Sequence, residues 1–218
     1  DCSWSRGLGD VYKRQKRSIR RVQRGLRFLR IFLSTIVLGL TGKNASGKGT
    51  VAEVLKEHGF VYHSLSDSLR DELNLLGKKE TRENLIEIGN KLRNTGGPGV
   101  LADKLTSKLT LDCNHIVDSI RNPFEVESLR ESIRVGKFFL ISVDADAKLR
   151  YERLSLRGRI GDSDTWEKFL EQEQKEDNND DPNKQQLSKT MKLADFNIDN
   201  SGTLENLKKQ VNKIISEL

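Results

Sequence analysis

The residues best suited to chemistry form the segment TGKNASGKGT at 41–50, which directly follows the apolar run TIVLGL. Glycine loses more backbone freedom on folding than any other residue, so an interaction must offset the cost of ordering this loop. The segment matches the pattern GxxxxGK[ST] from Gly42 to Lys48 but has glycine at position 49. Such loops point backbone N–H groups at a phosphate, while the lysine and the next helix add positive charge. Because a Cβ would block close approach of the phosphate, we predict a phosphate-binding loop.

A carboxylate and a guanidinium lie at the end of a second apolar run, HIVDSI at 115–120. Asp118 follows the apolar pair Ile116 and Val117 of this run, where P-loop enzymes place the acid that holds Mg²⁺. Arg121 follows three residues later, and its planar guanidinium can bind a phosphate through two parallel hydrogen bonds. The alternative for Asp118 is a carboxylate that only caps a turn. The pair predicts a metal- and phosphate-binding edge beside the glycine loop.

Two further groups of charged residues have helical spacing. Asp67 and Arg70 lie three positions apart and share one helical face, where they can address one acceptor molecule. A solvated surface pair is the alternative. Arg153 and Arg157 are four positions apart, and Arg159 follows them. We favour a phosphate-facing role for these arginines over an exposed basic face.

A parallel sheet would position these residues, because short apolar runs alternate with amphipathic helical patterns from Thr35 onward. The predicted strands are 35–40, 60–63, 115–120, 137–143 and 196–199. The predicted helical stripes include Val51, Val54, Leu55 and His58, then Leu65, Leu69, Leu73 and Leu76, and finally Leu204, Leu207, Val211, Ile214 and Leu218. Trp166 and Phe169 fit one face of a helix at 164–173, where we expect packing. The polar segment 175–186 predicts an exposed loop, since it lacks the spacing of a calcium-binding EF-hand.

Composition excludes several other classes of protein. The net charge of +6 comes from residues 1–34, which hold ten Lys/Arg and two Asp/Glu, whereas residues 35–218 hold 28 and 30. This nearly neutral body gives no reason to expect a nucleic-acid partner. Cys2 and Cys113 cannot build a disulfide framework or a four-ligand zinc site, so we expect a reducing compartment. No apolar run approaches the roughly 18 residues that span a bilayer.

The basic N-terminal region needs separate treatment. Residues 1–15 resemble the translated remnant of a sequencing adapter, and residues 16–34 have an apolar stripe among arginines. We expect the extension 1–34 to lie outside the fold, with a single domain over 35–218. A transit peptide or a membrane-surface helix is the alternative for residues 16–34.

Several stretches together resemble P-loop nucleoside monophosphate kinases and their relatives, which include adenylate kinases and dephospho-CoA kinases. Some of them are similar to an archaeal and phage-associated nucleotide-kinase-like group, also met beside dCMP deaminases. The stretches that carry the resemblance are GKGT (47–50), SLSDSLRDEL (64–73), TRENLIEIGNKLRNTGGPGVLADKL (81–105), IVDSIRNPFEVESLR (116–130), LRYERLSLRGR (149–159) and ADFNIDNSGTLENL (194–207). The resemblance implies a three-layer α/β P-loop domain whose five-stranded parallel sheet has the order 2-3-1-4-5.

The same resemblance implies phosphoryl transfer from ATP with Mg²⁺ to a small phosphorylated acceptor, with a (deoxy)nucleoside monophosphate favoured. The residues expected to bind ATP and its phosphates are Gly42, Lys43, Asn44, Ala45, Ser46, Gly47, Lys48, Gly49, Thr50, Arg153 and Asn200. The expected catalytic residues are Lys48, Asp118, Arg121 and Arg157, and the expected acceptor-binding residues are Asp67, Arg70 and Arg121. The expected Mg²⁺ ligands, in part through water, are Thr50 and Asp118; which hydroxyl meets the metal stays open, because Gly49 replaces the usual Ser or Thr.

Two alternatives to a nucleotide kinase stay open. A dephospho-CoA kinase is the nearest enzyme, but its acidic motif after the second strand is replaced here by SLSDSLR. A nucleotide-binding regulatory module with little turnover is the other, and the missing hydroxyl at position 49 favours it. In each case we expect small-molecule nucleotide partners, a monomer or small homo-oligomer, and a cytoplasmic protein; a genuine transit peptide would make it mitochondrial.

Overall fold

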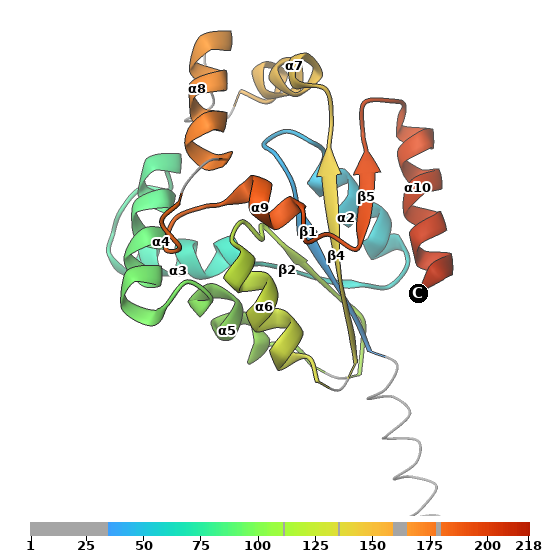
Figure 1. The fold of residues 1–218 in the computed structure, drawn as a ribbon, viewed down its shortest axis with the longest axis horizontal. Coiled ribbons are helices and arrows are strands. Elements are labelled where there is room, and N and C mark those ends of the chain that lie inside the picture. Colours follow the sequence, from blue (N-terminus) through green and yellow to red (C-terminus); the bar gives the residue numbers. More distant parts are fainter. Residues whose placement is uncertain (1–34, 111, 135, 159–164, 178–179) are drawn as a thin grey trace, which may run out of the picture.

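The computed structural model describes residues 35–218 except 111, 135, 159–164 and 178–179, and a five-stranded parallel sheet forms its centre (Figure 1). The strands are β1 (Ile36–Thr41), β2 (Val61–Ser64), β3 (His115–Asp118), β4 (Lys137–Asp144) and β5 (Phe196–Asp199). Their order is β2-β3-β1-β4-β5, and every neighbouring pair is parallel, which confirms the expected fold. The third strand ends at Asp118, two residues earlier than predicted, because Ser119 adopts a left-handed φ of 68° that breaks the extended backbone.

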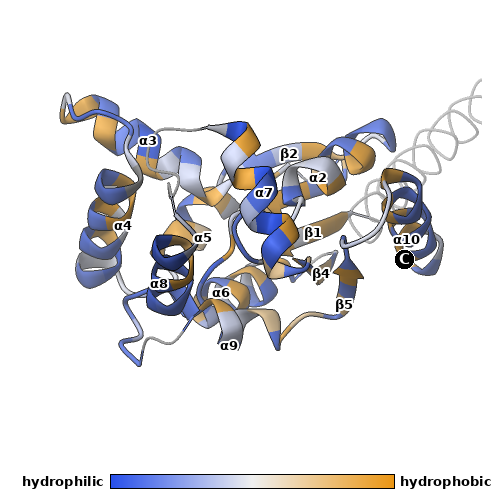
Figure 2. Cartoon of the chain, turned by 90° about the horizontal axis from the view of Figure 1, so that it is seen from above, coloured by the Kyte–Doolittle hydropathy of each residue, from blue (hydrophilic) through white to orange (hydrophobic). Residues whose placement is uncertain are grey.

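Helices cover both faces of the sheet (Figure 1). They are α2 (Lys48–Glu57), α3 (Leu65–Leu75), α4 (Arg82–Gly96), α5 (Val100–Thr106), α6 (Pro123–Ser132), α7 (Ala147–Arg157), α8 (Trp166–Asp177), α9 (Leu187–Met191) and α10 (Leu204–Glu217). Apolar residues of α2 and α10 form one core with the sheet, and those of α3, α5 and α6 form the other. Seen from above, α7 crosses the carboxyl ends of the strands (Figure 2).

Strand β1 shows how the sequence builds the two cores. Leu38 and Leu40 point to the α2/α10 face, and Val37 points to the opposite face, as the two-residue period of a strand requires. All three side chains are buried, and each contributes about 1.5–3 kcal/mol relative to exposure. A Cβ at Gly39 would lie 2.7 Å from the Ile120 side chain, so glycine lets β1 pack closely there.

Three expectations about the helices need correction. His58 is the C-cap of α2, exposed, and bonded to Asn212 at 2.9 Å rather than part of a core stripe. Leu76, which caps α3, and Leu204, which begins α10, are 48% and 56% exposed. These side chains lie at helix ends, where periodicity continues but no second element covers them. In the described part of the chain, no helix is long and apolar enough to cross a bilayer.

The polar segment 175–186 is not simply an exposed loop. Helix α8 continues to Asp177, and both Glu176 and Gln186 are buried. The amide of Asn122 donates to the carbonyls of Pro182 and Lys184 at 2.6 and 2.8 Å. Asn122, which is distant in sequence, therefore satisfies backbone carbonyls of this segment. Composition alone does not predict such a contact.

The expected packing of the α8 aromatic residues is confirmed. Phe169 is buried, Trp166 stacks on it with ring centroids 5.4 Å apart, and Tyr151 of α7 contacts both rings. The buried guanidinium of Arg150 lies 5.5 Å from the Phe169 ring and also pairs with Glu173. Helices α7 and α8 are thus joined by one aromatic and ionic contact beside the carboxyl ends of the strands.

Candidate active site

The polar residues singled out above meet in a cavity of about 930 Å³ at the carboxyl ends of β1 and β3. After β1 the chain runs to β2 and β3 on one side of β1, and after β3 it crosses to β4 on the other side. Parallel α/β sheets bind ligands at the carboxyl ends of the strands where the direction of the connections reverses in this way. The basic residues that line the cavity are Lys48, Arg70, Arg93, Arg121, Arg153 and Arg157. The acidic ones are Glu80 and Asp118. A cavity with this excess of cations suits a polyanion.

The glycine loop joins β1 to α2, and protein contacts explain two of its glycines. A Cβ at Gly42 would lie 2.0 Å from the Val143 carbonyl oxygen, and Gly42 has a φ of 142°. Gly47 caps α2 with a φ of 99°, and a Cβ there would lie 2.0 Å from Asn200 Nδ2. At Gly49 a Cβ would meet nothing within 4 Å. The first two glycines therefore shape the loop against its neighbours, whereas Gly49 leaves open space at the helix start.

Lys48, the first residue of α2, points back over the loop. Its Nζ donates to the carbonyl oxygens of Gly42 and Lys43 at 2.7 and 2.8 Å, and the residue is half-buried. Burial lowers the pKa of Lys48 to about 8, against the opposing effect of the Asp118 carboxylate. An anion bound beside this ammonium would favour its charged form.

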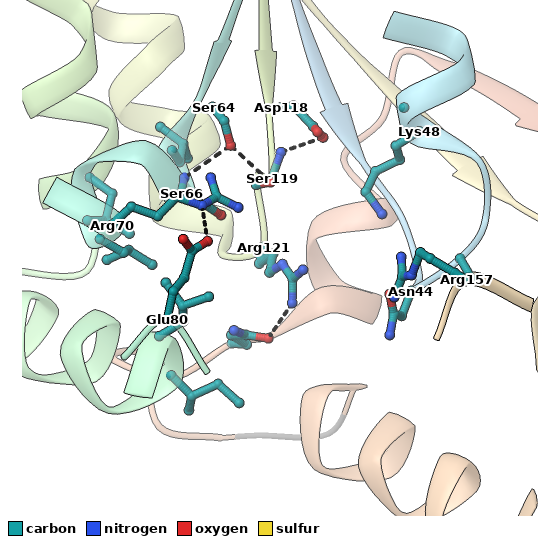
Figure 3. A pocket seen from close by; sticks show the side chains of 18 of the residues that line it. Asn44, Lys48, Ser64, Ser66, Arg70, Glu80, Asp118, Ser119, Arg121 and Arg157 are labelled. Carbon is teal, nitrogen blue, oxygen red and sulfur yellow. Dashed lines mark hydrogen bonds and ion pairs between the residues drawn. The ribbon is translucent and has the colours of Figure 1, made fainter. Parts of the chain in front are cut away.

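Asp118 is buried at the end of β3, next to the loop. Its Oδ1 accepts from the Ser119 backbone N–H at 2.6 Å, and its Oδ2 accepts from the Tyr62 hydroxyl at 2.9 Å. The left-handed φ of Ser119 turns the chain so that its N–H can reach the carboxylate. Asp118 is thus held firmly at the cavity wall, facing the same space as Lys48 (Figure 3).

Arg121 is positioned by a buried turn at the start of α6. The Glu125 carboxylate accepts from the backbone N–H groups of Arg121 and Asn122 at 2.9 and 3.1 Å, and from Arg93 at 2.8 Å. Asn122 completes a capping box with Glu125, ahead of Pro123 at the first helical position. Both members of the Arg93–Glu125 pair are at most 4% exposed, so losing either one would leave an uncompensated buried charge.

The guanidinium of Arg121 lies between the two sides of the cavity (Figure 3). Its Nη1 donates to Gln185 Oε1 at 3.3 Å and lies 3.8 Å from the carboxylate of Glu176. Both partners come from the segment that the sequence predicted to be a loop in solvent. They orient the arginine toward the cavity from the side opposite the sheet.

On the side of the cavity formed by α3, Arg70 faces the cavity with carboxylates around it. Its Nε donates to Glu80 at 2.5 Å, and its Nη1 donates to Asp67 at 2.8 Å. All three side chains are 38–54% exposed, so each pair contributes only about 0–1 kcal/mol. Arg70 and Glu80 line the cavity, whereas Asp67 is absent from its wall and reaches it only through Arg70.

Arg153 and Arg157 approach the loop from α7. Arg157 donates to Asn44 Oδ1 at 3.4 Å, and Arg153 donates to the Asn200 carbonyl at 2.8 Å. In the described part of the chain, Arg153 Nη1 is a buried donor without a hydrogen-bond partner. Both arginines line the cavity, and Arg159 lies outside the described residues.

The remaining loop residues differ in what they face. Asn44, Ala45 and Thr50 line the cavity. Lys43 instead lies 3.6 Å from Asp177 of α8, and Ser46 is fully buried.

Asn200, which was expected to bind ATP, is buried against the loop. Its Nδ2 donates to the Ser46 carbonyl at 2.8 Å, and its backbone N–H donates to the Asp144 carbonyl at 2.8 Å. Together with the bond from Arg153, these contacts join β4, the glycine loop and α7. A direct contact between Asn200 and a nucleotide stays a prediction.

The donor set fits ATP carried with Mg²⁺. Among the residues that the structure describes, Lys48 donates to loop carbonyls and Arg153 Nη1 has no hydrogen-bond partner, as expected of groups that bind phosphate. Among the described residues no cluster of three or more His, Cys, Asp or Glu forms a metal cage. Mg²⁺ suits such a site, because it binds through one or two carboxylates plus substrate phosphates and water. Asp118 and Thr50 are the residues that would face it.

Several residues of the cavity escaped the sequence analysis. They are Tyr62, Ser64, Ser66, Glu80, Ser119 and Gln185. Ser64 accepts from the Ser66 backbone N–H and donates to the Ser119 hydroxyl, both at 3.2 Å. Tyr62 carried one usable signal, since it precedes the end of a predicted strand. Glu80 and Gln185 carried none, because polar residues in polar segments indicate only solvent.

Comparison with known proteins agrees with this fold and loop. A family model described as an AAA domain matches residues 38–179. A solved structure from Thermus thermophilus has a TM-score of 0.54 at 21% identity, covering 85% of this chain and 98% of its own. A shikimate kinase from Bacteroides thetaiotaomicron has a TM-score of 0.50 at 12% identity, covering 84% and 99%. These two likenesses concern the fold alone. Sheet order and glycine loop define the class as a P-loop protein with a kinase-like fold.

Curated relatives place the chain more narrowly. It is 33% identical over 185 residues to a UPF0200 protein of Pyrococcus furiosus, and the aligned region covers 83% of this chain and 96% of the relative. It is 32% identical over 187 residues to a UPF0200 protein of Pyrococcus abyssi, which covers 84% and 97%. The chain belongs to the UPF0200 family and carries its AAA domain over most of its length.

Proposed function

We propose that the protein transfers a phosphoryl group from ATP, bound with Mg²⁺, to a small phosphorylated acceptor of the (deoxy)nucleoside monophosphate class. The observation that carries the proposal is one cavity in which the glycine loop and Asp118 face Arg70 across Arg121. Phosphoryl transfer depends on positioning two anionic substrates and neutralising the moving charge, with little covalent work for the protein.

Each group has a distinct role in this proposal. The loop amides and Lys48 bind the β- and γ-phosphates, and Asp118 and Thr50 face Mg²⁺, which supplies charge neutralisation when bound. Arg121 and Arg157 neutralise the transferring phosphoryl group. Arg70 binds the phosphate of the acceptor once Glu80 releases it.

The acceptor side also supports a molecule with an apolar, planar part. Leu69, Leu85 and Ile86 line this side of the cavity together with Arg70. A base would lie on these side chains while the guanidinium holds a phosphate. A polyol would leave its hydroxyl groups facing leucines, at a cost in lost hydrogen bonds.

A regulatory module with little turnover is the second candidate, and Gly49 is the observation that favours it. The exposed start of α2 lacks the hydroxyl that usually meets the metal in this motif. Such a module would bind ATP at the same loop without releasing ADP.

The test is a panel of nucleoside monophosphates and deoxynucleoside monophosphates, with dephospho-CoA included, assayed for ADP release with ATP and Mg²⁺. We expect acceptor-dependent ADP release by at least one monophosphate and none by the Lys48→Met variant. Turnover with dephospho-CoA alone would replace the acceptor class. ATP binding without ADP release from any acceptor would favour the regulatory module.

A further inference from the structure

Tyr62 reaches the Asp118 carboxylate from the edge strand β2. In the β2–β3 register Ser64 lies opposite Asp118, and Tyr62 lies opposite Ile116, two residues earlier. Residues two apart on a strand share a face, so Tyr62 and Asp118 point to the same side of the sheet. The long tyrosine side chain extends along the strand, and its hydroxyl donates to Oδ2 at 2.9 Å. An edge residue is thereby connected to the centre of the site.

Asp118 has hydrogen-bond donors on both of its oxygens. Tyr62 occupies Oδ2, and the Ser119 backbone N–H occupies Oδ1 at 2.6 Å. An ionised carboxylate offers about four acceptor positions, so about two stay free for water around a metal. With the Ser119 contact alone, the carboxylate could rotate about its Cβ–Cγ bond. The tyrosine contact removes that freedom.

The phenol ring is itself held in place, although Tyr62 is 37% exposed. Lys56 of α2 places its Nζ 4.8 Å from the ring centroid, a cation–π contact. Burial and the neighbouring Asp118 raise the pKa of Tyr62, so the hydroxyl keeps the proton that it donates. Helix α2, which begins at the phosphate loop, therefore also supports the group that orients the acid.

We propose that Tyr62 is a positioning residue that acts through Asp118 and sets the affinity of the ATP site for Mg²⁺. This inference rests on the proposed function, because it takes Asp118 to be the residue that faces the metal. In this role Tyr62 would act through its hydrogen bond to Asp118 and would not itself be a ligand of the ion. Its contribution is to present the Asp118 carboxylate in a single orientation.

The experiment is a Mg²⁺ titration of ATP binding to the full chain, measured by calorimetry, with Tyr62→Phe as the variant. This change removes one oxygen atom and keeps the ring and its contact with Lys56. We expect the half-saturating Mg²⁺ concentration to rise about threefold to tenfold, as for the loss of one hydrogen bond. ATP binding measured without a divalent metal should be unchanged. A shift smaller than about twofold would overturn the proposal.

A double-mutant cycle separates a positioning role from general loosening of the site. If Tyr62 acts only through Asp118, adding Tyr62→Phe to Asp118→Asn should change the Mg²⁺ dependence no further. An undiminished effect in that background would overturn the proposal. Lys56→Met removes the cation above the ring but keeps the hydroxyl, so its shift in the Mg²⁺ titration should be smaller than that of Tyr62→Phe.

The outcome is distinguishable from failure of the proposed function. If no acceptor is phosphorylated but Tyr62→Phe still shifts the Mg²⁺ dependence, phosphoryl transfer fails and the role of Tyr62 stands. If acceptors are phosphorylated and the titration of Tyr62→Phe matches the wild type, the kinase stands and the role of Tyr62 is wrong. ATP binding that ignores Mg²⁺ in the wild type would overturn the Tyr62 proposal directly.

Discussion

The two sides of the cavity are built in different ways. On the phosphate side, buried contacts fix the loop: Gly42 packs on the Val143 carbonyl, and Asn200 donates to Ser46. On the acceptor side, Arg70 is held by two exposed carboxylates that contribute little to stability. One side is therefore preorganised for its ligand, whereas the other must exchange internal ion pairs for ligand contacts.

This difference indicates which side of the cavity should set affinity and which should set selectivity. A preorganised site loses little conformational entropy when its ligand binds, so the phosphate side should set affinity for ATP. Under the proposed function, an acceptor would displace Glu80 from Arg70, so the acceptor side should set selectivity and the order of events. Arg121 lies between the two sides (Figure 3), where the proposed function gives it a role toward both substrates.

The largest effect should come from Lys48→Met, which removes the charge on the preorganised side. We expect transfer to fall by at least about a hundredfold, because a charge aimed at the phosphates is lost. The fold should persist, since losing the two bonds to loop carbonyls is offset by removing a partly buried charge. Thermal melting and ATP calorimetry check this. Wild-type ATP affinity in the folded variant would mean that the loop is not the ATP site.

Arg121→Lys addresses the residue shared by both sides. Lysine keeps the charge but loses the planar two-donor group, so we expect kcat to fall about tenfold, or about 1.4 kcal/mol, with little change in ATP affinity. Steady-state kinetics on the acceptor found in the panel provide the measurement. An unchanged kcat would remove Arg121 from the transfer step.

The lowered pKa of Lys48 predicts how ATP binding responds to pH. The empty site loses the lysine proton as pH rises through about 8, whereas bound phosphate retains the charged form. Binding should therefore take up a proton, and ATP affinity should fall about tenfold between about pH 7 and pH 9. Calorimetry in buffers of different ionisation enthalpy measures the uptake, and Lys48→Met should show none. A wild type with no proton uptake would contradict the shift.

Glu80→Gln tests whether the acceptor side is closed by its own carboxylate. Without that negative charge, Arg70 is freer to bind a phosphate, so we expect KM for the acceptor to fall about threefold and KM for ATP to stay constant. Asp67→Asn is the matched control, because Asp67 contacts the same guanidinium from outside the cavity wall. A rise in acceptor KM for Glu80→Gln would instead assign Glu80 a contact with the acceptor itself.

The smallest effect should come from Gly49→Ser. The open space at this position accepts a Cβ, and serine has a helix propensity better than glycine by about 0.5 kcal/mol, so stability should not fall. We expect Mg²⁺ to half-saturate ATP binding at a concentration about twofold lower, with Gly49→Ala as the control that adds a Cβ without a hydroxyl. Gly42→Ala should destabilise strongly, because its Cβ would lie 2.0 Å from a carbonyl oxygen. A destabilised Gly49→Ser protein would show that the space is not free.

Local pattern was enough to predict the phosphate side. The strands, the loop 42–50 and the strand-ending Asp118 depend on side-chain periodicity and on glycine spacing over a few neighbouring residues. The positive φ values of Gly42 and Gly47 are a local backbone requirement of this kind, which glycine in the sequence reveals.

Contacts between distant segments determine the parts of the site that the sequence did not predict. Tyr62 and Asp118 are 56 positions apart, and Ser46 and Asn200 are 154 apart. Glu176 was predicted to lie in solvent and is buried against Arg121 instead. No periodicity connects such residues, and a polar side chain looks the same in sequence whether water or another side chain is its partner. Only the packing of α8, β2 and β5 around the loop determines which polar groups meet.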